Sequence, residues 1–437
     1  MNEAKLYQHR IGLIYLPIGV LGLAAFLLLS SIWLPLPPSE ITISTGRQGG
    51  MYQEHAGAYR ALLQQRGIEL LIRDSAGTGE NLKRIKSTEN NVHVAFAQGG
   101  YVLGEPSDAN AVSIQTLAQV DIEPIWVFSR FRDVDSLLRL QGQKVAIGQS
   151  GSGSRAVALK LLSQVRLEAK DLLQTEVAGM DTLVALREGR LDATIFVASV
   201  NAPLVQALLN TPNIYLAQLK RSAALSERMS YLDARFAAAG SLNANRLQPT
   251  QDMVLLSTFA SVLVREDVHP MIKRALMHVL MQHHAAAGPL HRANEFPNLK
   301  RLEFPSAVQS REVLSAGLPW VEQKLPVQAA QWFYRLLMIG LPLAVLAWMI
   351  CKALPGYLIW RIDSRINRWY GELKFIENDL SHGEPGGLEI AQFRARLRKI
   401  TDRATTTPMP KRYMQRLFLL RQHVGLVQNK ILSRLGR

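Results

Sequence analysis

Serine and glycine residues gather in one stretch near the middle of the chain, from Lys144 to Arg155, which reads Lys-Val-Ala-Ile-Gly-Gln-Ser-Gly-Ser-Gly-Ser-Arg. Its apolar start, Val145 to Ile147, is typical of a buried strand, and residues 156–165 have the apolar spacing of a helix. At a helix start, unpaired backbone N–H groups and hydroxyl groups can face one ligand, and the helix dipole favours an anion there. We therefore expect a pocket for a carboxylate or a phosphate, although a glycine-serine turn without a ligand has the same composition. The candidate binding residues of this stretch are Ser150, Ser152, Gly153, Ser154 and Arg155.

The same stretch departs from two well-known loop motifs. Ser154 stands where a Walker A loop requires lysine, and Ser152 stands where a nucleophile elbow around Ser150 requires glycine. Elsewhere no nucleophile has a base placed beside it in the sequence, so we expect no catalytic residues and no enzymatic activity. His278 and His283 are five residues apart, which does not place both on one face of a helix, and His-Glu-x-x-His does not occur. We therefore also expect no metal site and no cofactor.

The positive charge of the chain is concentrated near its end. Of the net charge of +15, residues 352–437 carry +10, because they hold 17 Lys or Arg against 7 Asp or Glu. A basic segment that follows an apolar run fits the positive-inside rule better than a DNA-binding surface, so we expect no nucleic-acid partner. The single cysteine, Cys351, excludes an internal disulfide.

Two apolar runs predict membrane helices at 11–34 and 332–351. The first holds no charged residue and follows Lys5 and Arg10, which predicts an uncleaved anchor after a cytoplasmic N-terminus of residues 1–10; a cleaved signal peptide is the alternative. The second contains Arg335 near its start, and a buried amphipathic helix is the alternative there. Residues 352–437 are predicted to form a basic, helical, cytoplasmic tail, whose charged face either is attracted to an anionic inner leaflet or is simply solvated.

The segment between the apolar runs predicts a two-lobed α/β fold. Strand-like runs at 41–45, 68–72 and 92–96 alternate with helical patterns, which favours a mainly parallel sheet with ligands at the carboxyl ends of its strands. We expect a binding domain at 40–320, with lobe 1 at about 40–125 and 220–320 and lobe 2 at about 126–219. Two such lobes joined by crossing strands can close on a ligand by hinge motion.

Further candidate binding residues follow the expected strands of both lobes. Arg47 and Arg155 could clamp a carboxylate, although a solvated arginine is the alternative for each. Tyr52 could contact the ligand or only pack in lobe 1, and Asn81 could donate to a carboxylate or only stabilise a turn. Phe196 could form a wall of the cleft or belong to the core. The candidates outside the serine-glycine stretch are Gly46, Arg47, Tyr52, Thr78, Asn81, Gln98, Phe196 and Val197.

A family resemblance rests on five short segments taken together. They are Thr45-Gly-Arg-Gln-Gly-Gly-Met-Tyr52-Gln53, Ser75-Ala-Gly-Thr78-Gly-Glu80-Asn81-Leu82, Val94-Ala-Phe-Ala-Gln98, Gly148-Gln-Ser-Gly-Ser-Gly-Ser154 and Leu186-Arg-Glu-Gly-Arg-Leu-Asp192-Ala193. In this order and at this spacing they resemble the TAXI family of solute-binding subunits of TRAP transporters. Arg47 and Gln53 depart from its pattern, because they stand in place of a glycine and of a second tyrosine.

The resemblance implies a periplasmic-binding-protein-like fold of type II and a function in transport. It implies a binding domain outside the bacterial inner membrane, with a small organic acid or amino acid as ligand, glutamate or 2-oxoglutarate in the first place, delivered to TRAP membrane subunits. Typical members lack a second membrane span and a basic tail. For a chain held at both ends, a ligand sensor that signals through its cytoplasmic tail is therefore the alternative function.

Overall fold

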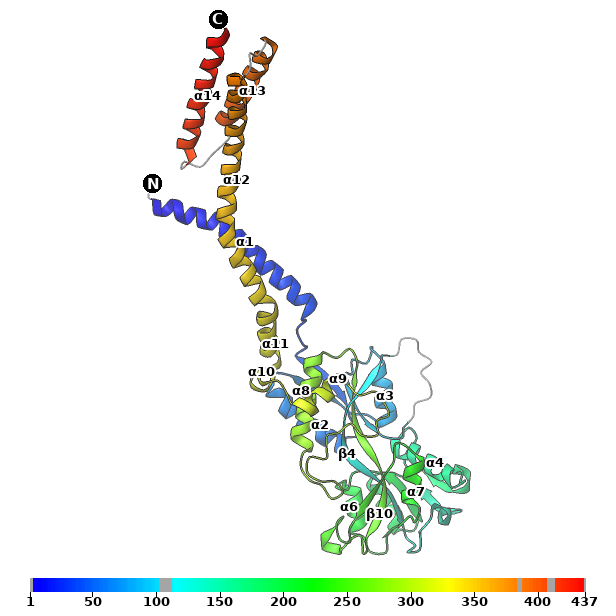
Figure 1. The fold of residues 1–437 in the computed structure, drawn as a ribbon. Helices are drawn as coiled ribbons and strands as arrows, with labels where there is room; N and C mark the ends of the chain where they lie inside the picture. Colours follow the sequence, from blue (N-terminus) through cyan, green and yellow to red (C-terminus); the bar gives the residue numbers. More distant parts are fainter. Residues whose placement is uncertain (1–2, 102–111, 383–386, 407–412, 436–437) are drawn as a thin grey trace. The chain divides into compact units, whose positions relative to one another are not determined.

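The computed structural model describes residues 3–101, 112–382, 387–406 and 413–435 (Figure 1). Parts of the predicted N-terminal segment and of the tail, namely 1–2, 383–386, 407–412 and 436–437, lie outside the described residues. The chain divides into two compact units, one of residues 34–334 and one of residues 1–33 together with 335–437.

The first unit is built on a continuous sheet, in which the described strands run in the order β2-β1-β3-β10-β4-β7-β5-β6, with β8 on β4 and β9 on β10. The strands are β1 (Glu40–Ser44), β2 (Glu69–Arg73), β3 (Val94–Gln98), β4 (Ile114–Ser129), β5 (Lys144–Ala146), β6 (Leu173–Thr175), β7 (Ala193–Val197), β8 (Tyr215–Leu216), β9 (Asp233–Ala237) and β10 (Met253–Arg265). Pairs β1–β2, β1–β3, β5–β6 and β5–β7 are parallel, whereas β10 is antiparallel to β3, β4 and β9.

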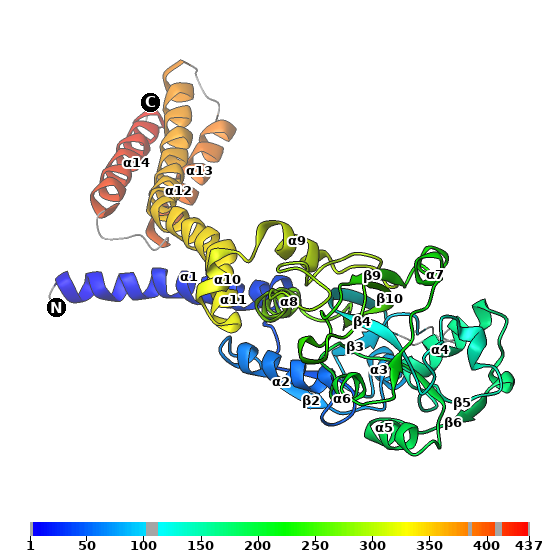
Figure 2. The same cartoon turned by 90° about the horizontal axis from the view of Figure 1, so that it is seen from below.

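Strands β4 and β10 connect the two lobes. Within β4, residues up to Pro124 pair with β10, and residues 125–129 pair with β7, so one strand serves both sheets. Strand β10 likewise pairs with β3 through residues 260–264 and with β9 through residues 253–257. Figures 1 and 2 show both strands running from one lobe into the other. The predicted two-lobed α/β fold, with strands that cross between the lobes, is confirmed.

Lobe 1 buries apolar side chains between its sheet and helices α2 and α8. Ile43 and Phe96 from the sheet pack with Leu63 of α2 and Leu276 of α8, and each of these side chains is fully buried. The helices of lobe 1 are α2 (Met51–Gln64), α3 (Thr78–Lys86), α8 (Pro270–His284), α9 (Val308–Ala316) and α10 (Trp320–Lys324).

Lobe 2 has an apolar core on each face of its sheet. Val145 and Val157 belong to one core, whereas Trp126 and Leu186 belong to the other. The first core also takes Leu225 from the segment after residue 219, which the sequence assigned to lobe 1. The helices are α4 (Gly153–Gln164), α5 (Met180–Arg187), α6 (Pro203–Leu209) and α7 (Ser222–Arg228), with short 3-10 turns at Leu137–Leu140, Ala169–Asp171 and Ala244–Arg246.

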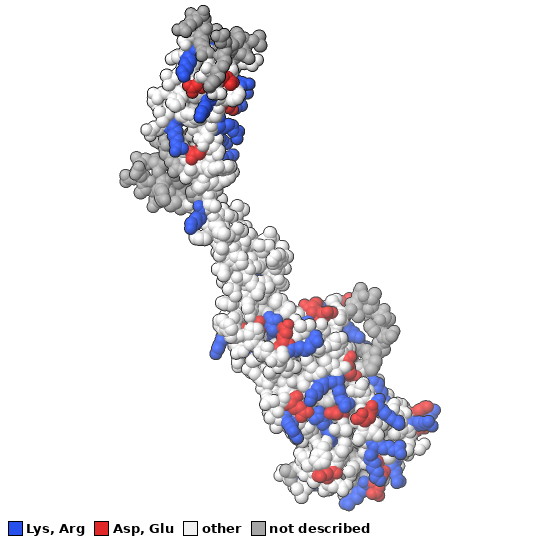
Figure 3. All heavy atoms as spheres, in the orientation of Figure 1, with Lys and Arg blue, Asp and Glu red and all other residues white. Residues whose placement is uncertain are grey.

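The second unit contains two helices that are long and apolar enough to cross a membrane, by length and composition. One is α1 (Glu3–Trp33), in its part Tyr15–Trp33, and the other is the helical run Val327–Ser381. This run comprises α11 (Val327–Arg335), a π-helical turn (Leu336–Gly340) and α12 (Leu341–His382), and its start lies in the first unit. The visible surface of the apolar helices is white in Figure 3, without the blue and red of charged side chains.

The tail after residue 352 has an apolar core of its own. The end of α12 packs against α13 (Gly387–Thr406) and α14 (Met414–Leu435). Ile376, Leu397 and Leu420, one from each helix, are at most 1% exposed. The tail is therefore a packed group of helices, with its basic side chains on the outside.

Candidate functional site

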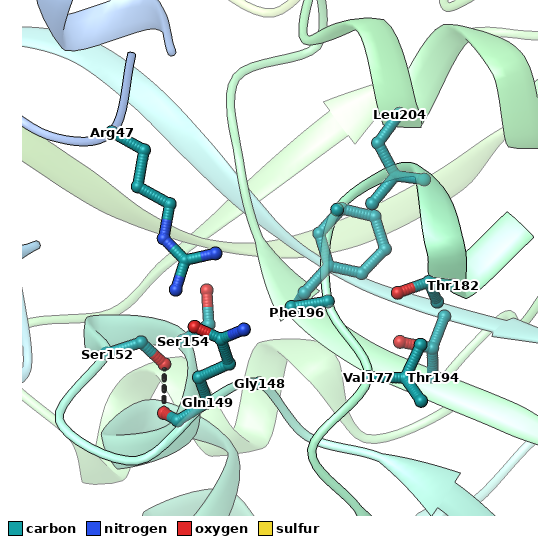
Figure 4. Close-up of a pocket in the computed structure, with 12 residues that line it drawn as sticks. Arg47, Gly148, Gln149, Ser152, Ser154, Val177, Thr182, Thr194, Phe196 and Leu204 are labelled. Atoms are coloured by element: carbon teal, nitrogen blue, oxygen red, sulfur yellow. Dashed lines mark hydrogen bonds between the residues drawn. The ribbon is translucent and has the colours of Figure 1, made fainter. Parts of the chain in front are cut away.

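A pocket of about 150 Å³ lies at the carboxyl ends of β5 and β7. Lobe 2 supplies nearly all of its wall, and Arg47 from the loop after β1 brings a side chain of lobe 1 to it. Figure 4 shows the Arg47 guanidinium directed toward the side chains of Ser152, Ser154 and Gln149. The described lining residues are Arg47, Gly148, Gln149, Ser152, Ser154, Val177, Ala178, Gly179, Thr182, Thr194, Phe196 and Leu204.

The start of helix α4 is fixed by its own serine. Ser152 is the N-cap, and its hydroxyl accepts from the N–H of Arg155 at 3.2 Å and donates to the carbonyl of Gln149 at 2.8 Å (Figure 4). Gly148 has φ of +89°, and a Cβ there would lie 3.0 Å from Ser152 Oγ, so glycine is needed at this turn. The positive end of the α4 dipole is thereby held at the pocket.

Ser154 joins α4 to strand β7. Its hydroxyl accepts from the N–H of Val197 at 3.1 Å and donates to the carbonyl of Val197 at 3.3 Å. Because successive side chains of a strand point to opposite faces, Val197 is buried in one core while Phe196 lines the pocket. The ring of Phe196 stacks on Phe128, with centroids 6.2 Å apart.

A second helix begins at the same pocket. Helix α5 starts after Gly179, whose φ of +64° suits glycine, and Thr182 in its first turn lines the pocket. Among the described lining residues, Arg47 is the one charged side chain. Two helix N-termini and one guanidinium, with no described carboxylate in the wall, make the pocket suited to an anion. Residues 177–182 were not among the predicted binding residues, although Gly179 stands before an apolar helical pattern and glycine is an accepted residue at a helix N-cap.

Two predicted site residues, Asn81 and Thr78, have side chains that are hydrogen-bonded within lobe 1 and not to the pocket. Asn81 is fully buried, accepts from the Ser44 hydroxyl at 2.6 Å, and donates to the carbonyls of Thr45 and Phe96. The Thr78 hydroxyl accepts from the N–H of Gln98 at 3.0 Å. These bonds tie β1 and β3 to the start of α3.

Four more residues that were predicted to bind the ligand lie in different parts of the two lobes. The Tyr52 ring stacks on Phe96 at 4.6 Å, and its hydroxyl donates to Glu123 Oε2 at 3.1 Å. The carbonyl of Gly46 accepts from the N–H of Ser75 at 3.0 Å. Ser150 is exposed at the turn before α4, and Arg155 donates to the carbonyl of Gly148 at 3.3 Å.

The two lobes touch where the glycine loops meet. A Cβ on Gly153 of α4 would lie 2.9 Å from Gln98 Oε1 at the end of β3, and a Cβ on Gly79 would lie 2.9 Å from the carbonyl of Gly151. The Nε2 atom of Gln98 is buried and has no hydrogen-bond partner among the described residues. The lobes therefore approach each other backbone to backbone beside the pocket.

Strand β4, which connects the two lobes, carries a buried carboxyl group. Glu123 of β4 is 6% exposed, and burial raises its pKa to about 8, while the hydrogen bond from Tyr52 opposes the shift and the charge of Asp121 adds to it. Burial also raises the pKa of Tyr52 well above its usual value. Glu123 thus carries its proton at neutral pH in the folded chain.

This burial predicts a pH-dependent stability that Glu123→Gln removes. Above about pH 4.5 the unfolded chain loses the Glu123 proton, while the folded chain keeps it to about pH 8, so stability falls as the pH rises across this window. The loss is about 1.4 kcal/mol for each pKa unit. Glutamine stays neutral and still accepts from Tyr52, so the variant is expected to gain stability at pH 8.5 and little at pH 5. Thermal melting of the full chain at both values tests this, with the exposed Glu69→Gln as control; an equal pH dependence in wild type and E123Q contradicts it.

Three histidines that the sequence analysis did not bring together lie side by side in lobe 1. His55 of α2 faces His283 and His284 at the end of α8, and His55 Nδ1 lies 3.0 Å from His283 Nε2. Burial, followed by the charge of His283, lowers the pKa of His55 to about 4. His278 and His283 belong to one expected helix, whereas His55 joins the group only through the contact of α2 with α8.

The chain was compared with curated proteins and with solved structures. No curated protein matches the chain. A protein from Bordetella bronchiseptica RB50 of solved structure is 16% identical, over 68% of this chain and 99% of that one, with a TM-score of 0.41. The periplasmic aliphatic sulphonate binding protein SsuA from Escherichia coli is 11% identical, over 72% and 87%, with a TM-score of 0.37. The alkanesulfonate-binding protein SsuA from Xanthomonas axonopodis pv. citri is 13% identical, over 56% and 73%, with a TM-score of 0.31.

Sequence identities of 11% to 16% do not assign a family. The family of this chain is therefore assigned from a match to a sequence model. A sequence model of the NMT1-like family matches residues 43–293, which is more than half of the chain and nearly all of both lobes. The match agrees with a solute-binding type of protein and does not distinguish a TAXI subunit within that type. The chain belongs to the NMT1-like family.

Proposed function

We propose that this chain is a membrane-tethered solute-binding protein of TAXI-TRAP type that binds a small carboxylate between its lobes for transport. The observation that carries the proposal is the charge of the pocket. Arg47 of lobe 1 faces the N-termini of α4 and α5 of lobe 2, and no described carboxylate lines the space between them. A guanidinium binds a carboxylate with two parallel hydrogen bonds, and a helix N-terminus stabilises the same charge.

The size of the pocket favours a small ligand. Its volume of about 150 Å³ is below the roughly 300–1,000 Å³ typical of pockets for drug-sized ligands. Glutamate and 2-oxoglutarate are the ligands that the resemblance suggests, and Phe196 and Leu204 offer apolar surface for their carbon chain. A ligand held by Arg47 from one side and by the N-terminal end of α4 from the other favours the closed arrangement of the lobes over an open one.

The membrane topology in this proposal follows from the apolar helices and the charges. Helix α1 and the run from Val327 would cross the bacterial inner membrane, which places both termini in the cytoplasm and the two lobes in the periplasm. The net charge of +10 on residues 352–437 supports a cytoplasmic tail and attraction to anionic lipids. The proposed partners are TRAP membrane subunits that accept the ligand locally, because a doubly tethered protein does not diffuse through the periplasm.

A binding screen of the full chain in detergent tests this proposal. Thermal melting is measured with glutamate, 2-oxoglutarate, other small carboxylates, amino acids, alkanesulfonates and inorganic phosphate. At a concentration one hundred times Kd, a ligand should add about 2.7 kcal/mol of stability, which gives a clear rise in melting temperature. A rise with small carboxylates alone supports the proposal. A rise with sulfonates or phosphate instead, or no rise from a folded chain, overturns the carboxylate assignment.

The packed tail favours a second candidate function, that of a ligand sensor. Helix α12 continues from the apolar run into the apolar core of the tail, where Ile376 is fully buried. A continuous helix can transmit a change from the lobes to α13 and α14. Removal of residues 383–437 separates the two functions. Uptake of ligand through membrane subunits should survive this deletion in a transport protein, whereas a sensor keeps ligand binding and loses its downstream response.

A further inference from the structure

Helices α2 and α8 pack on the same face of the lobe 1 sheet and meet at a group of aromatic and imidazole rings. Tyr59 of α2 is fully buried there, and Met277 and Leu280 of α8 belong to the same core. His55 lies one turn before Tyr59, and His283 and His284 end α8. None of these side chains lines the pocket beside Arg47, so the group is a separate feature of lobe 1.

The three imidazole rings surround one point. The ring centroids of His283 and His284 are 4.7 Å apart, those of His55 and His284 are 4.9 Å apart, and those of His55 and His283 are 5.1 Å apart. Each residue offers a nitrogen, and these nitrogens all lie within 4.8 Å of one another. The rings are steeply inclined to each other, at 63° to 87°, so they converge rather than stack.

We propose that His55, His283 and His284 form a binding site for a divalent transition-metal ion, zinc in the first place. Around a tetrahedral zinc with Zn–N distances of 2.0–2.1 Å, imidazole centroids lie about 5 Å apart and ligand nitrogens about 3.3 Å apart. The centroid separations in lobe 1 have this value. The His55 Nδ1 to His283 Nε2 distance of 3.0 Å needs a small expansion, and nitrogens that lie up to 4.8 Å apart would move closer when an ion binds. Neutral imidazoles select zinc, copper or nickel over magnesium and calcium.

The surroundings of the group resemble the outer shell of a metal site. The Tyr59 hydroxyl is hydrogen-bonded to His284 Nε2 at 2.5 Å, which orients that ring. The His55 ring lies against the rings of Tyr59 and Phe96, with centroids 6.4 Å away in each case. His55 and His283 are half-buried while His284 is buried, so an ion has a path to the site from solvent. Three protein ligands leave one coordination position for water or another small ligand.

A bound ion would link the first turns of α2 to the end of α8. Helix α2 begins directly after the loop that carries Arg47, so the ion would brace the element that positions this side chain. The metal proposal uses contacts within lobe 1 and does not depend on which solute the lobes bind. Its failure and the failure of the solute proposal are therefore distinguishable.

The test measures the zinc that is bound to the full chain. The protein is purified in detergent with an affinity tag that contains no histidine. After treatment with a chelator, the protein is dialysed against ZnCl2, and bound zinc is counted by mass spectrometry; the account predicts one ion per chain. His283→Ala is the decisive variant, because His283 is half-buried and its loss leaves the core packed. Its affinity for zinc should fall about 100-fold or more, since losses of outer-shell partners alone cost 10–100-fold. His278→Ala, on the same helix and outside the group, should bind zinc as the wild type does.

A second measurement keeps the result independent of folding. Cobalt(II) bound by three imidazoles in tetrahedral geometry gives visible absorption, which should appear in the wild type and in H278A and be lost in H55A, H283A and H284A. Apo melting temperatures identify any variant that has simply unfolded. Absence of stoichiometric zinc, or equal zinc binding by H283A and H278A, overturns the proposal and leaves a hydrogen-bonded group of neutral histidines.

Discussion

Replacing Arg47 with glutamine is expected to lower the affinity for a carboxylate ligand about 10- to 100-fold, while the fold keeps its stability. A hydrogen bond to a charged group contributes about 1.5–3 kcal/mol, and 1.4 kcal/mol is tenfold in Kd. The Arg47 side chain is exposed on a loop and points into the pocket, so its removal takes binding energy without taking core packing. Titration calorimetry of the full chain with the best ligand of the screen measures the change.

Two further variants make this measurement specific. Arg47→Lys keeps the positive charge but cannot form bidentate hydrogen bonds with a carboxylate. Its affinity for the ligand should therefore lie between those of R47Q and the wild type. Arg60→Gln removes another exposed arginine of lobe 1, outside the pocket, and should bind as the wild type does. Equal losses in R47Q and R60Q would mean that general positive charge, and not the Arg47 contact, attracts the ligand.

Gly100→Ala is expected to destabilise the domain by about 2–4 kcal/mol. Gly100 follows β3 with φ of +86°, and a Cβ there would lie 2.5 Å from the Tyr231 ring, which packs against lobe 2. A rigid ring cannot yield as a flexible side chain does, so the variant combines overpacking with backbone strain. The N–H of Gly100 donates to the Glu303 carboxylate at 3.0 Å, which holds the backbone in this position.

Gly142→Ala is the matched control for this prediction. Gly142 also has a positive φ, +72°, but a Cβ there would meet no atom within 4 Å. The control variant therefore measures backbone strain alone, and we expect it to cost about 1 kcal/mol. Melting curves of both variants give the comparison, and equal losses would show that the contact with Tyr231 costs nothing.

The sequence predicts the local elements of this fold well and their long-range pairing poorly. The strand, loop and helix around Gly148 to Arg155 are readable because hydrophobic periodicity is a local property. The position of β10 between β3 and β4 is not, because it depends on contacts more than 130 residues apart along the chain. The residues on both sides of Pro124 form one strand, since this proline lies where β4 leaves β10 and joins β7.

At the candidate site, the residue types could be predicted from the sequence, whereas their partners in space could not. Asn81 lies at the expected helix start. Its side-chain amide, however, is already hydrogen-bonded to Ser44, Thr45 and Phe96, on or next to neighbouring strands. A donor's free capacity depends on its neighbours in space, which spacing in the sequence does not reveal. His55 belongs to the histidine group only through the packing of α2 on α8. Arg47, in contrast, was predicted from its residue type and its place after an expected strand, and its side chain does line the pocket.

The most direct test of a ligand held between the lobes measures the distance between them. With the native Cys351 replaced by serine, cysteines at the exposed Gln65, just after α2, and at the exposed Gln164 of α4 carry spin labels, and double electron–electron resonance reads their separation in the full chain. The account predicts that the ligand chosen by the screen shifts and narrows the distance distribution, and that R47Q lacks this response at the same concentration. A ligand that binds and leaves the distribution unchanged would contradict binding between hinged lobes.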